Sequence, residues 1–300
     1  MPRLLTQAKQ QNEAATLPPK PVALFVGGTS GIGKASVEAL ARYAKGNIHI
    51  IIVGRNETAA NQIISSLPQS PESNYEFVHC DVSLMSNISS FARSLSSRLT
   101  KLNYLFLSTG YLSTEAFKPT SEGIDQRLAV TYYSRFKFIQ EFLPLLQEAK
   151  QLGEAARVVV VLASGHGKPL DLDNLGLKKK HTPFLSLFYG PACTELAVEE
   201  FAARNPAISF THIHPGLVDT PILSNFWLTK YFVWIMRLLF LKKAEDCAEW
   251  MLCPLLGDTF ESGAFHLNEY AEPVPPQSLH ITPERQKAVY DHSVETVSPY

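Results

Sequence analysis

The 300-residue sequence has no strong charge of either sign, only four cysteines and no visible internal repeat. Its 27 Lys and Arg residues nearly balance 28 Asp and Glu residues, and the net charge of −1 gives no indication of nucleic-acid binding. The four cysteines contain no C-x-x-C pair. A reduced protein of the cytoplasm, without a bound metal, is therefore expected.

Residues 1–20 lack the apolar segment of a secretory signal and end in Pro18-Pro19. We expect a disordered arm here, with a weak organelle transit peptide as the alternative. From residue 21 to about 270 the hydrophobic pattern continues without a linker, so one domain is expected. The 45% hydrophobic content is ample for its core. Residues 271–300 form a Pro-rich tail, in which Thr282-Pro283 predicts the start of a short helix.

The clearest local feature is the segment VALFVGGTSGIGK, residues 22–34. Its apolar first half predicts a buried strand, and a helical pattern follows from Lys34. Between them Gly27, Gly31 and Gly33 form a G-x-x-x-G-x-G turn. Glycines let the backbone approach an anion, and the helix N-terminus offers free N–H groups. The pattern predicts a phosphate cradle, with a glycine turn that binds no ligand as the alternative.

A second strand-like segment, Ile48–Val53, ends in Gly54-Arg55-Asn56. In dinucleotide-binding folds the tip of the second strand lies at the adenosine ribose, where an acidic residue would bind the 2′-hydroxyl. Arg55 stands there instead, and its planar guanidinium suits a 2′-phosphate. This favours NADP(H) over NAD(H), with a solvated surface arginine as the alternative.

Strand-like and helix-like segments alternate along the rest of the chain. The alternation predicts an α/β protein with right-handed crossovers and a doubly wound parallel sheet that has helices on both faces. Ligands in such folds bind beyond the carboxyl ends of the strands. The predicted strands are Val22–Gly27, Ile48–Val53, Tyr75–His79, Leu102–Ser108, Arg157–Ala163, Ile208–Ile213 and Gly263–Leu267. One helix is predicted to begin at Lys34. The other predicted helices are Glu57–Leu67, Leu84–Thr100, Ser121–Lys150, Phe184–Arg204 and Ala244–Leu256.

Residues near the ends of these strands carry a family resemblance. Besides the glycine turn they are Asp81-Val82 after the third strand, Gly110 after the fourth, Ser164 after the fifth, Tyr189 in the next helix, and Pro215-Gly216 with Thr220 after the sixth. With these motifs the segment from Val22 to Leu267 resembles the short-chain dehydrogenase/reductase (SDR) family. The resemblance implies a Rossmann-like sheet of seven strands and a bound nicotinamide cofactor.

The same resemblance implies where NADP(H) would be held. Asp81 would contact the adenine amino group, and the segment Pro215–Thr220 would line the nicotinamide. The predicted cofactor-binding residues are Gly27, Thr29, Ser30, Gly31, Ile32, Gly33, Arg55, Asn56, Asp81, Val82, Gly110, Pro215, Gly216, Val218 and Thr220.

The family's chemistry uses a Tyr as general acid/base, a Lys four residues later, a Ser that binds the substrate carbonyl and a helix Asn that supports a water relay. Ser164 and Tyr189 match, with a spacing that resembles the retinol-dehydrogenase-like branch. The Lys position is Cys193, and the Asn position is Thr131. A phenol without a neighbouring cation keeps a pKa of about 10, so it is a poor base at neutral pH but still a proton donor.

Two residues are candidates to compensate for these losses. His166 lies two residues past Ser164, and an imidazole titrates near neutral pH; a surface or backbone-bonded histidine is the alternative. Cys193 is a candidate nucleophile, but no cation is near it in sequence, which favours an inert packed thiol. The predicted catalytic residues are therefore Ser164, Tyr189 and His166.

The segment Phe226–Leu241 is strongly apolar, with only Lys230 and Arg237 as charges. It is shorter than the roughly 20 residues of a membrane-spanning helix. It follows Thr220-Pro221, where SDR proteins carry a substrate lid. Residues 221–243 are therefore expected to form an apolar lid over an apolar substrate. A membrane-surface helix or a dimer-contact helix is the alternative.

The sequence leads to three functional hypotheses. The first is an NADPH-dependent carbonyl reductase of an apolar metabolite, with Tyr189 as proton donor and Ser164 as carbonyl anchor. The second is a non-redox isomerase, lyase or cyclase on the same fold, and the third is a non-catalytic nucleotide-binding protein. The segments RVVVVLASGHGK and NPAISFTHIHPGLVDT resemble fungal SDR members found with biosynthetic enzymes, which supports the first two. Because SDR proteins are commonly dimers or tetramers, a homodimer or homotetramer is expected through Ser121–Lys150 and Phe184–Arg204.

Overall fold

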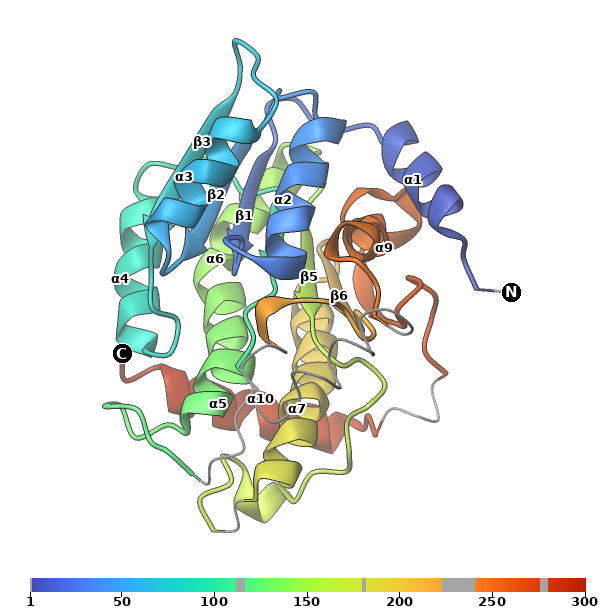
Figure 1. The fold of residues 1–300 in the computed structure, drawn as a ribbon. Coiled ribbons are helices and arrows are strands. Elements are labelled where there is room, and N and C mark those ends of the chain that lie inside the picture. Colours follow the sequence, from blue (N-terminus) through green and yellow to red (C-terminus); the bar gives the residue numbers. More distant parts are fainter. Residues whose placement is uncertain (1, 112–116, 180–181, 223–240, 276–279) are drawn as a thin grey trace, which may run out of the picture.

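The computed structural model describes residues 2–111, 117–179, 182–222, 241–275 and 280–300. Its centre is a sheet of seven parallel strands in the order β3-β2-β1-β4-β5-β6-β7 (Figure 1). The strands are β1 (Val22–Val26), β2 (His49–Gly54), β3 (Asn74–His79), β4 (Tyr104–Leu107), β5 (Arg157–Val161), β6 (Ser209–Ile213) and β7 (Gly263–Leu267). The predicted doubly wound, Rossmann-like α/β fold is confirmed.

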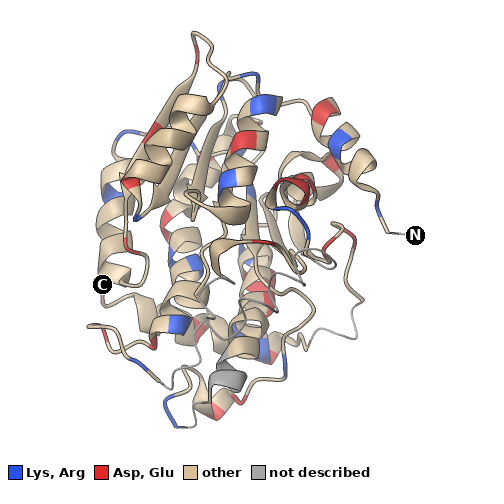
Figure 2. Ribbon diagram, viewed as in Figure 1, with Lys and Arg blue, Asp and Glu red and all other residues tan. Residues whose placement is uncertain are grey.

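The central strands are apolar because helices cover both of their faces. Along β1, Leu24 and Val26 pack into the core on one face of the sheet, while Ala23 and Phe25 pack into the core on the other. Figure 2 shows that Lys, Arg, Asp and Glu of both signs are spread over helices and loops. The hydrophobic effect therefore fixes the sheet in the middle of the molecule.

The helices form two layers around the sheet. One layer contains α1 (Leu5–Ala14), α2 (Gly31–Tyr43), α3 (Glu57–Ser66) and α9 (Ala244–Leu256). The other contains α4 (Met85–Ser96), α6 (Ser134–Gln151), α7 (Pro183–Arg204) and α10 (Pro283–Val297). In Figure 1 the carboxyl ends of the strands point to the lower half of the molecule, which also holds the first half of α7 and α10.

The single helix predicted over Ser121–Lys150 is divided in the structure. Asp125 caps its start, because the carboxylate accepts hydrogen bonds from the Arg127 N–H and the Leu128 N–H, both at 3.1 Å. A short helix α5 (Gln126–Leu128) and a π-helical turn η1 (Ala129–Tyr133) precede α6. The π-helical turn places Thr131 in an irregular part of the helix, and such turns are frequent at functional sites.

The predicted disordered arm at residues 1–20 is wrong, because Leu5–Ala14 form helix α1 on the outer side of α9. Asn12 is buried, and its Nδ2 donates hydrogen bonds to the backbone oxygen of Glu249 at 2.8 Å and to its carboxylate at 3.1 Å. Arg42 and Tyr43 donate to the same carboxylate. No local sequence pattern predicts this docking, because Glu249 lies far along the chain.

The predicted C-terminal helix is confirmed and is longer than expected. The Thr282 side chain caps α10, which begins at a proline. The Tyr290 ring lies 5.3 Å from Phe136 of α6 and 5.3 Å from Phe201 of α7, and the Arg204 guanidinium lies 4.0 Å above it. Helix α10 therefore covers part of the α6–α7 surface that was expected to join two subunits.

Most of the predicted lid, residues 223–240, lies outside the described residues. No helix in the described ranges is long and apolar enough to cross a membrane.

Candidate active site

The turn between β1 and α2 is built from glycines that cannot carry side chains. Gly27 and Gly31 have φ angles of +91° and +54°, which favour glycine. A Cβ atom on Gly33 would lie 2.3 Å from the carbonyl oxygen of Gly27, so α2 starts in direct contact with the end of β1. Within the described residues no side-chain hydrogen bond from Ser30 caps α2. Its first N–H groups are therefore available to an anion.

The predicted cofactor residues of neighbouring strands meet around this turn. A Cβ on Gly31 would lie 3.0 Å from the Thr220 methyl group, so the segment after β6 faces the turn. A Cβ on Gly54 would lie 2.9 Å from the Thr29 methyl group, so the turn also packs on the end of β2. Arg55, the next residue, is exposed.

Asn56, which follows β2, and Asp81, which follows β3, accept hydrogen bonds from backbone N–H groups nearby in the chain. The Asn56 side chain caps α3 by accepting a hydrogen bond from the Ala59 N–H at 3.0 Å. The Asp81 carboxylate accepts a hydrogen bond from the Ser83 N–H at 3.0 Å, and Val82 is buried. These contacts fix the chain direction at the strand ends, where the predicted adenosine site lies.

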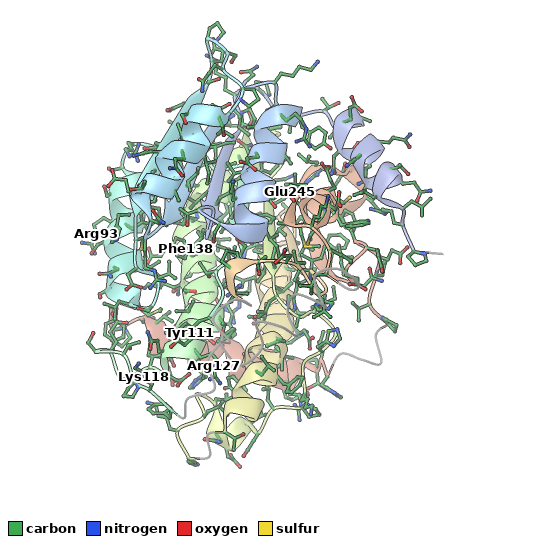
Figure 3. The ribbon with its side chains drawn as sticks, in the orientation of Figure 1. Arg93, Tyr111, Lys118, Arg127, Phe138 and Glu245 are labelled. Atoms are coloured by element: carbon green, nitrogen blue, oxygen red, sulfur yellow. The ribbon has the colours of Figure 1, made fainter. Side chains whose placement is uncertain are left out.

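The end of β4 lies close to the turn. A Cβ on Gly27 would come within 2.9 Å of the Thr109 backbone nitrogen, and one on Gly110 within 2.8 Å of Ile222. Figure 3 labels Tyr111, directly after Gly110, in the lower half of the molecule, toward which the strands point.

The segment Pro215–Thr220 is held by two residues that the sequence analysis missed, Lys242 and Glu269. The Leu217 and Asp219 backbones form a short parallel bridge with Lys242, with both hydrogen bonds at 2.9 Å. The Lys242 Nζ also pairs with Glu269 at 2.8 Å. Gly216 has a φ of +75°, which favours glycine, and its missing side chain leaves room for this carboxylate. No local sequence signal marks these partners.

The arrangement fits a dinucleotide. A side chain at Gly27 or Gly33 would collide with the backbone that shapes the turn, the helix N-terminus is open, and an exposed arginine stands at the end of β2. Oriented N–H groups and a guanidinium are the donors that bind phosphate oxygens.

Ser164 lies beyond the carboxyl end of β5 and is only 2% exposed. Its Oγ has no hydrogen-bond partner among the described residues. A buried hydroxyl without a partner is costly, so this atom is a candidate to bind a ligand oxygen.

Tyr189 has a different environment from the one its predicted role requires. Its phenol is 3% exposed and accepts a hydrogen bond from the Gly176 N–H at 2.8 Å. Burial, together with the neighbouring Cys193 and Tyr133, holds the pKa of Tyr189 far above its ordinary value. Within the described residues no hydrogen bond joins Tyr189 to Ser164. The structure thus places this tyrosine in the core between α7 and the π-helical turn.

Cys193 also lies in this core. Burial raises the pKa of its thiol, and the adjacent Tyr189 phenol only partly opposes the effect. The thiolate that a nucleophile requires is therefore disfavoured.

The loop that carries Ser164 is anchored by Glu195 of α7. This carboxylate is buried and accepts hydrogen bonds from the Gly165 N–H at 2.9 Å and the Gly167 N–H at 3.3 Å. A Cβ on Gly167 would lie 2.5 Å from it. Burial raises the pKa of Glu195 above its ordinary value, and the two N–H donors and His266 only partly oppose this rise. No local sequence pattern predicts this contact, because its partners lie about thirty residues apart.

His166 and His214 meet where β5 and β6 end. Their ring centroids are 4.5 Å apart. His166 is exposed, whereas His214 is half-buried and its Nδ1 has no partner in the described chain. Burial and then His166 lower the pKa of His214 to about 4, so it is neutral at pH 7.

Arg135 stands one turn after Thr131 and joins the ends of two central strands. Its guanidinium is buried and donates to the backbone oxygens of Thr109 at 2.6 Å and Val161 at 3.0 Å. It also donates to the π-helical turn at Thr131, at 2.7 Å. Burial lowers its pKa to about 9. Arg135 therefore fixes the loops after β4 and β5 relative to each other.

Comparisons with known proteins agree with this architecture. Residues 21–170, half of the chain, match the family model for short chain dehydrogenases. An oxidoreductase of Emericella nidulans, AN1596, is 35% identical over 273 residues, covering 89% of this chain and 76% of its own. Human polyprenol dehydrogenase is 27% identical over 279 residues, covering 88% of this chain and 81% of its own.

Among solved structures, an NADP complex of RhlG from Pseudomonas aeruginosa is similar with a TM-score of 0.63. Its sequence identity is 16%, and the match covers 84% of this chain and 97% of that one, which supports the fold alone. The family match and the Emericella relative, together with the sheet and the glycine turn, establish that the chain belongs to the short-chain dehydrogenase/reductase family.

Proposed function

We propose that the protein is an NADP(H)-dependent oxidoreductase that interconverts a carbonyl and a hydroxyl group on an apolar small molecule. The observation that carries the proposal is the glycine cradle at the N-terminus of α2, with the exposed Arg55 beside it at the end of β2. When bound, the dinucleotide supplies or accepts the hydride.

Each part of the chain has a role in this proposal. The N–H groups around Gly31 bind the pyrophosphate, and Arg55 binds the 2′-phosphate. The segment Pro215–Thr220, held by Lys242, lines the nicotinamide. The unpartnered Ser164 hydroxyl binds the oxygen of the substrate and orients it.

Two observations support an apolar substrate. Leu187 and Leu217 are 48% and 57% exposed, and Leu217 belongs to the segment that would line the nicotinamide. One relative is named for polyprenol, an isoprenoid alcohol. The segments RVVVVLASGHGK and NPAISFTHIHPGLVDT, which resemble fungal members found with biosynthetic enzymes, favour a substrate from secondary metabolism. The four free, buried cysteines are consistent with the cytoplasm.

The coenzyme preference is tested by Arg55→Ala, with Arg93→Ala as the matched control. Arg93 is an exposed arginine on α4, and Figure 3 shows it at the edge of the molecule. Losing a charge-assisted contact worth about 1.5–3 kcal/mol should weaken NADPH binding roughly ten- to hundredfold. NADH affinity should stay within about twofold. Equal losses for both coenzymes in calorimetric titrations would refute the assignment.

A second candidate function is a non-redox isomerase, lyase or cyclase that keeps the cofactor. It is favoured by the loss of the family lysine at Cys193 and by the engagement of the Tyr189 phenol with Gly176. A panel of ketones and aldehydes separates the two, because only a reductase oxidises bound NADPH.

A further inference from the structure

The ends of two adjacent strands bring a serine and two histidines to one place. β5 and β6 pair up to Val161 and Ile213, and the Leu162 N–H donates to the Ile213 oxygen at 2.9 Å. His214 follows directly, and Ser164 and His166 lie in the turn on the β5 side. Since His214 also precedes Pro215, the pair stands beside the segment assigned to the nicotinamide.

The usual acid of the family is engaged elsewhere in this chain. The Tyr189 phenol accepts a hydrogen bond from Gly176, and a Cβ at Gly176 would lie within 3.6 Å of the Tyr133 hydroxyl and 3.5 Å of His292. These neighbours belong to the π-helical turn and α10. The residue that delivers a proton to a substrate held by Ser164 therefore remains to be identified.

We propose that His166 delivers this proton, with His214 and Glu195 as positioning residues. The proposal rests on the proposed reductase function. His166 is exposed toward solvent, while its ring contacts His214. Glu195 fixes the loop on both sides of His166 through the Gly165 and Gly167 N–H groups.

Reduction of a carbonyl at this site needs a hydride and a proton. The carbonyl carbon gains the hydride that bound NADPH would supply, with NADP⁺ as the oxidised product, and the C=O π electrons move to oxygen, which takes the proton from the protonated His166. One imidazole N–H bond breaks, one O–H bond forms, and His166 is left neutral until it takes a proton from water. An imidazole suits this step because its charge changes near neutral pH.

Charged groups from neighbouring elements surround the two histidines. His214 faces His166, the Glu269 carboxylate and the Lys242 ammonium. Glu195 lies beneath the loop, with His266 of β7 nearby. Burial and His166 lower the pKa of His214, which leaves the exposed His166 ring as the proton donor of the proposal.

The first test measures reduction of farnesal, an apolar isoprenoid aldehyde, with NADPH. His166→Gln should lower kcat roughly a hundredfold or more, as expected for loss of a general acid, with NADPH affinity unchanged. His49→Gln, at the amino end of β2, is the matched control. Glu195→Ala should lower kcat, and Glu195→Gln should restore most of it, because an amide oxygen still accepts N–H hydrogen bonds. Tyr189→Phe should turn over faster than His166→Gln.

The second test does not depend on turnover. In NMR titrations, His166→Gln should raise the pKa of His214, because a neighbouring positive charge is removed. An unchanged His214 titration, or a His166→Gln variant that reduces farnesal at the wild-type rate, would overturn the proposal. Failure of the wild type to bind NADPH in calorimetry would instead refute the proposed function.

Discussion

Replacing Gly33 by Ala would place a methyl group in the tight contact between the start of α2 and Gly27, which shapes the candidate pyrophosphate cradle. The new Cβ would lie 2.3 Å from the Gly27 carbonyl oxygen, which is backbone and cannot rotate away. A relaxed carbon–oxygen contact is about 3.3 Å, so the turn and α2 must separate by about 1 Å. Alanine gains about 1 kcal/mol of helix propensity over glycine, which offsets part of an overpacking cost of about 1–3 kcal/mol. The variant should therefore fold.

Its cofactor affinity should fall much more than its stability. Widening the cradle by about 1 Å takes an N–H···O bond of about 2.9 Å beyond hydrogen-bonding range. Each charge-assisted bond lost costs about 1.5–3 kcal/mol, or roughly ten- to hundredfold in Kd. Calorimetric titration with NADPH measures this loss. Gly153→Ala is the control, since its φ of +75° brings strain but its Cβ meets open space. A folded Gly33→Ala protein that binds NADPH within about threefold of wild type would contradict this role of the glycine turn.

Three further predictions concern stability. Asn12→Ala removes the buried hydrogen bonds to Glu249 and should cost about 1–3 kcal/mol in urea unfolding, whereas Gln10→Ala on the exposed face of α1 should cost nothing measurable. Tyr290→Ala should cost about 2 kcal/mol because the α6–α7 surface loses its cover, and Tyr290→Phe should restore the loss. Burial raises the pKa of Glu76, but hydrogen bonds from Arg98 and His49 outweigh it and lower the pKa overall. Glu76 therefore stabilises the fold above about pH 4.3, and this contribution is lost as the pH falls further; Glu76→Gln should flatten the acid limb of the stability curve.

Local patterns were sufficient to predict the sheet and the cofactor side of the site. Each strand is an apolar run bounded by loop residues, and the glycine turn is contiguous in sequence. Seven predicted strands therefore appear within a few residues of their expected bounds. The helix start at Thr282 was likewise predictable, because the cap joins residues only three positions apart.

Contacts between distant segments were not readable from the sequence. The direction of the Tyr189 phenol depends on how α7 packs against the π-helical turn and α10. Glu195 and His214 contribute only because the fold brings α7, β5 and β6 together. Similarly, α1 appeared disordered because its anchor, Glu249, lies in another helix.

The subunit arrangement also depends on such a contact. Helix α10 lies over the α6–α7 surface through Tyr290, where dimerisation was expected. Light scattering on the full chain reports whether another surface is used.

Calorimetric titration of the wild-type protein with NADPH and with NADH measures whether the glycine cradle and Arg55 bind a phosphorylated dinucleotide. We expect one NADPH site per chain, with NADH bound at least roughly tenfold more weakly. No heat of binding with NADPH at saturating concentration would contradict it.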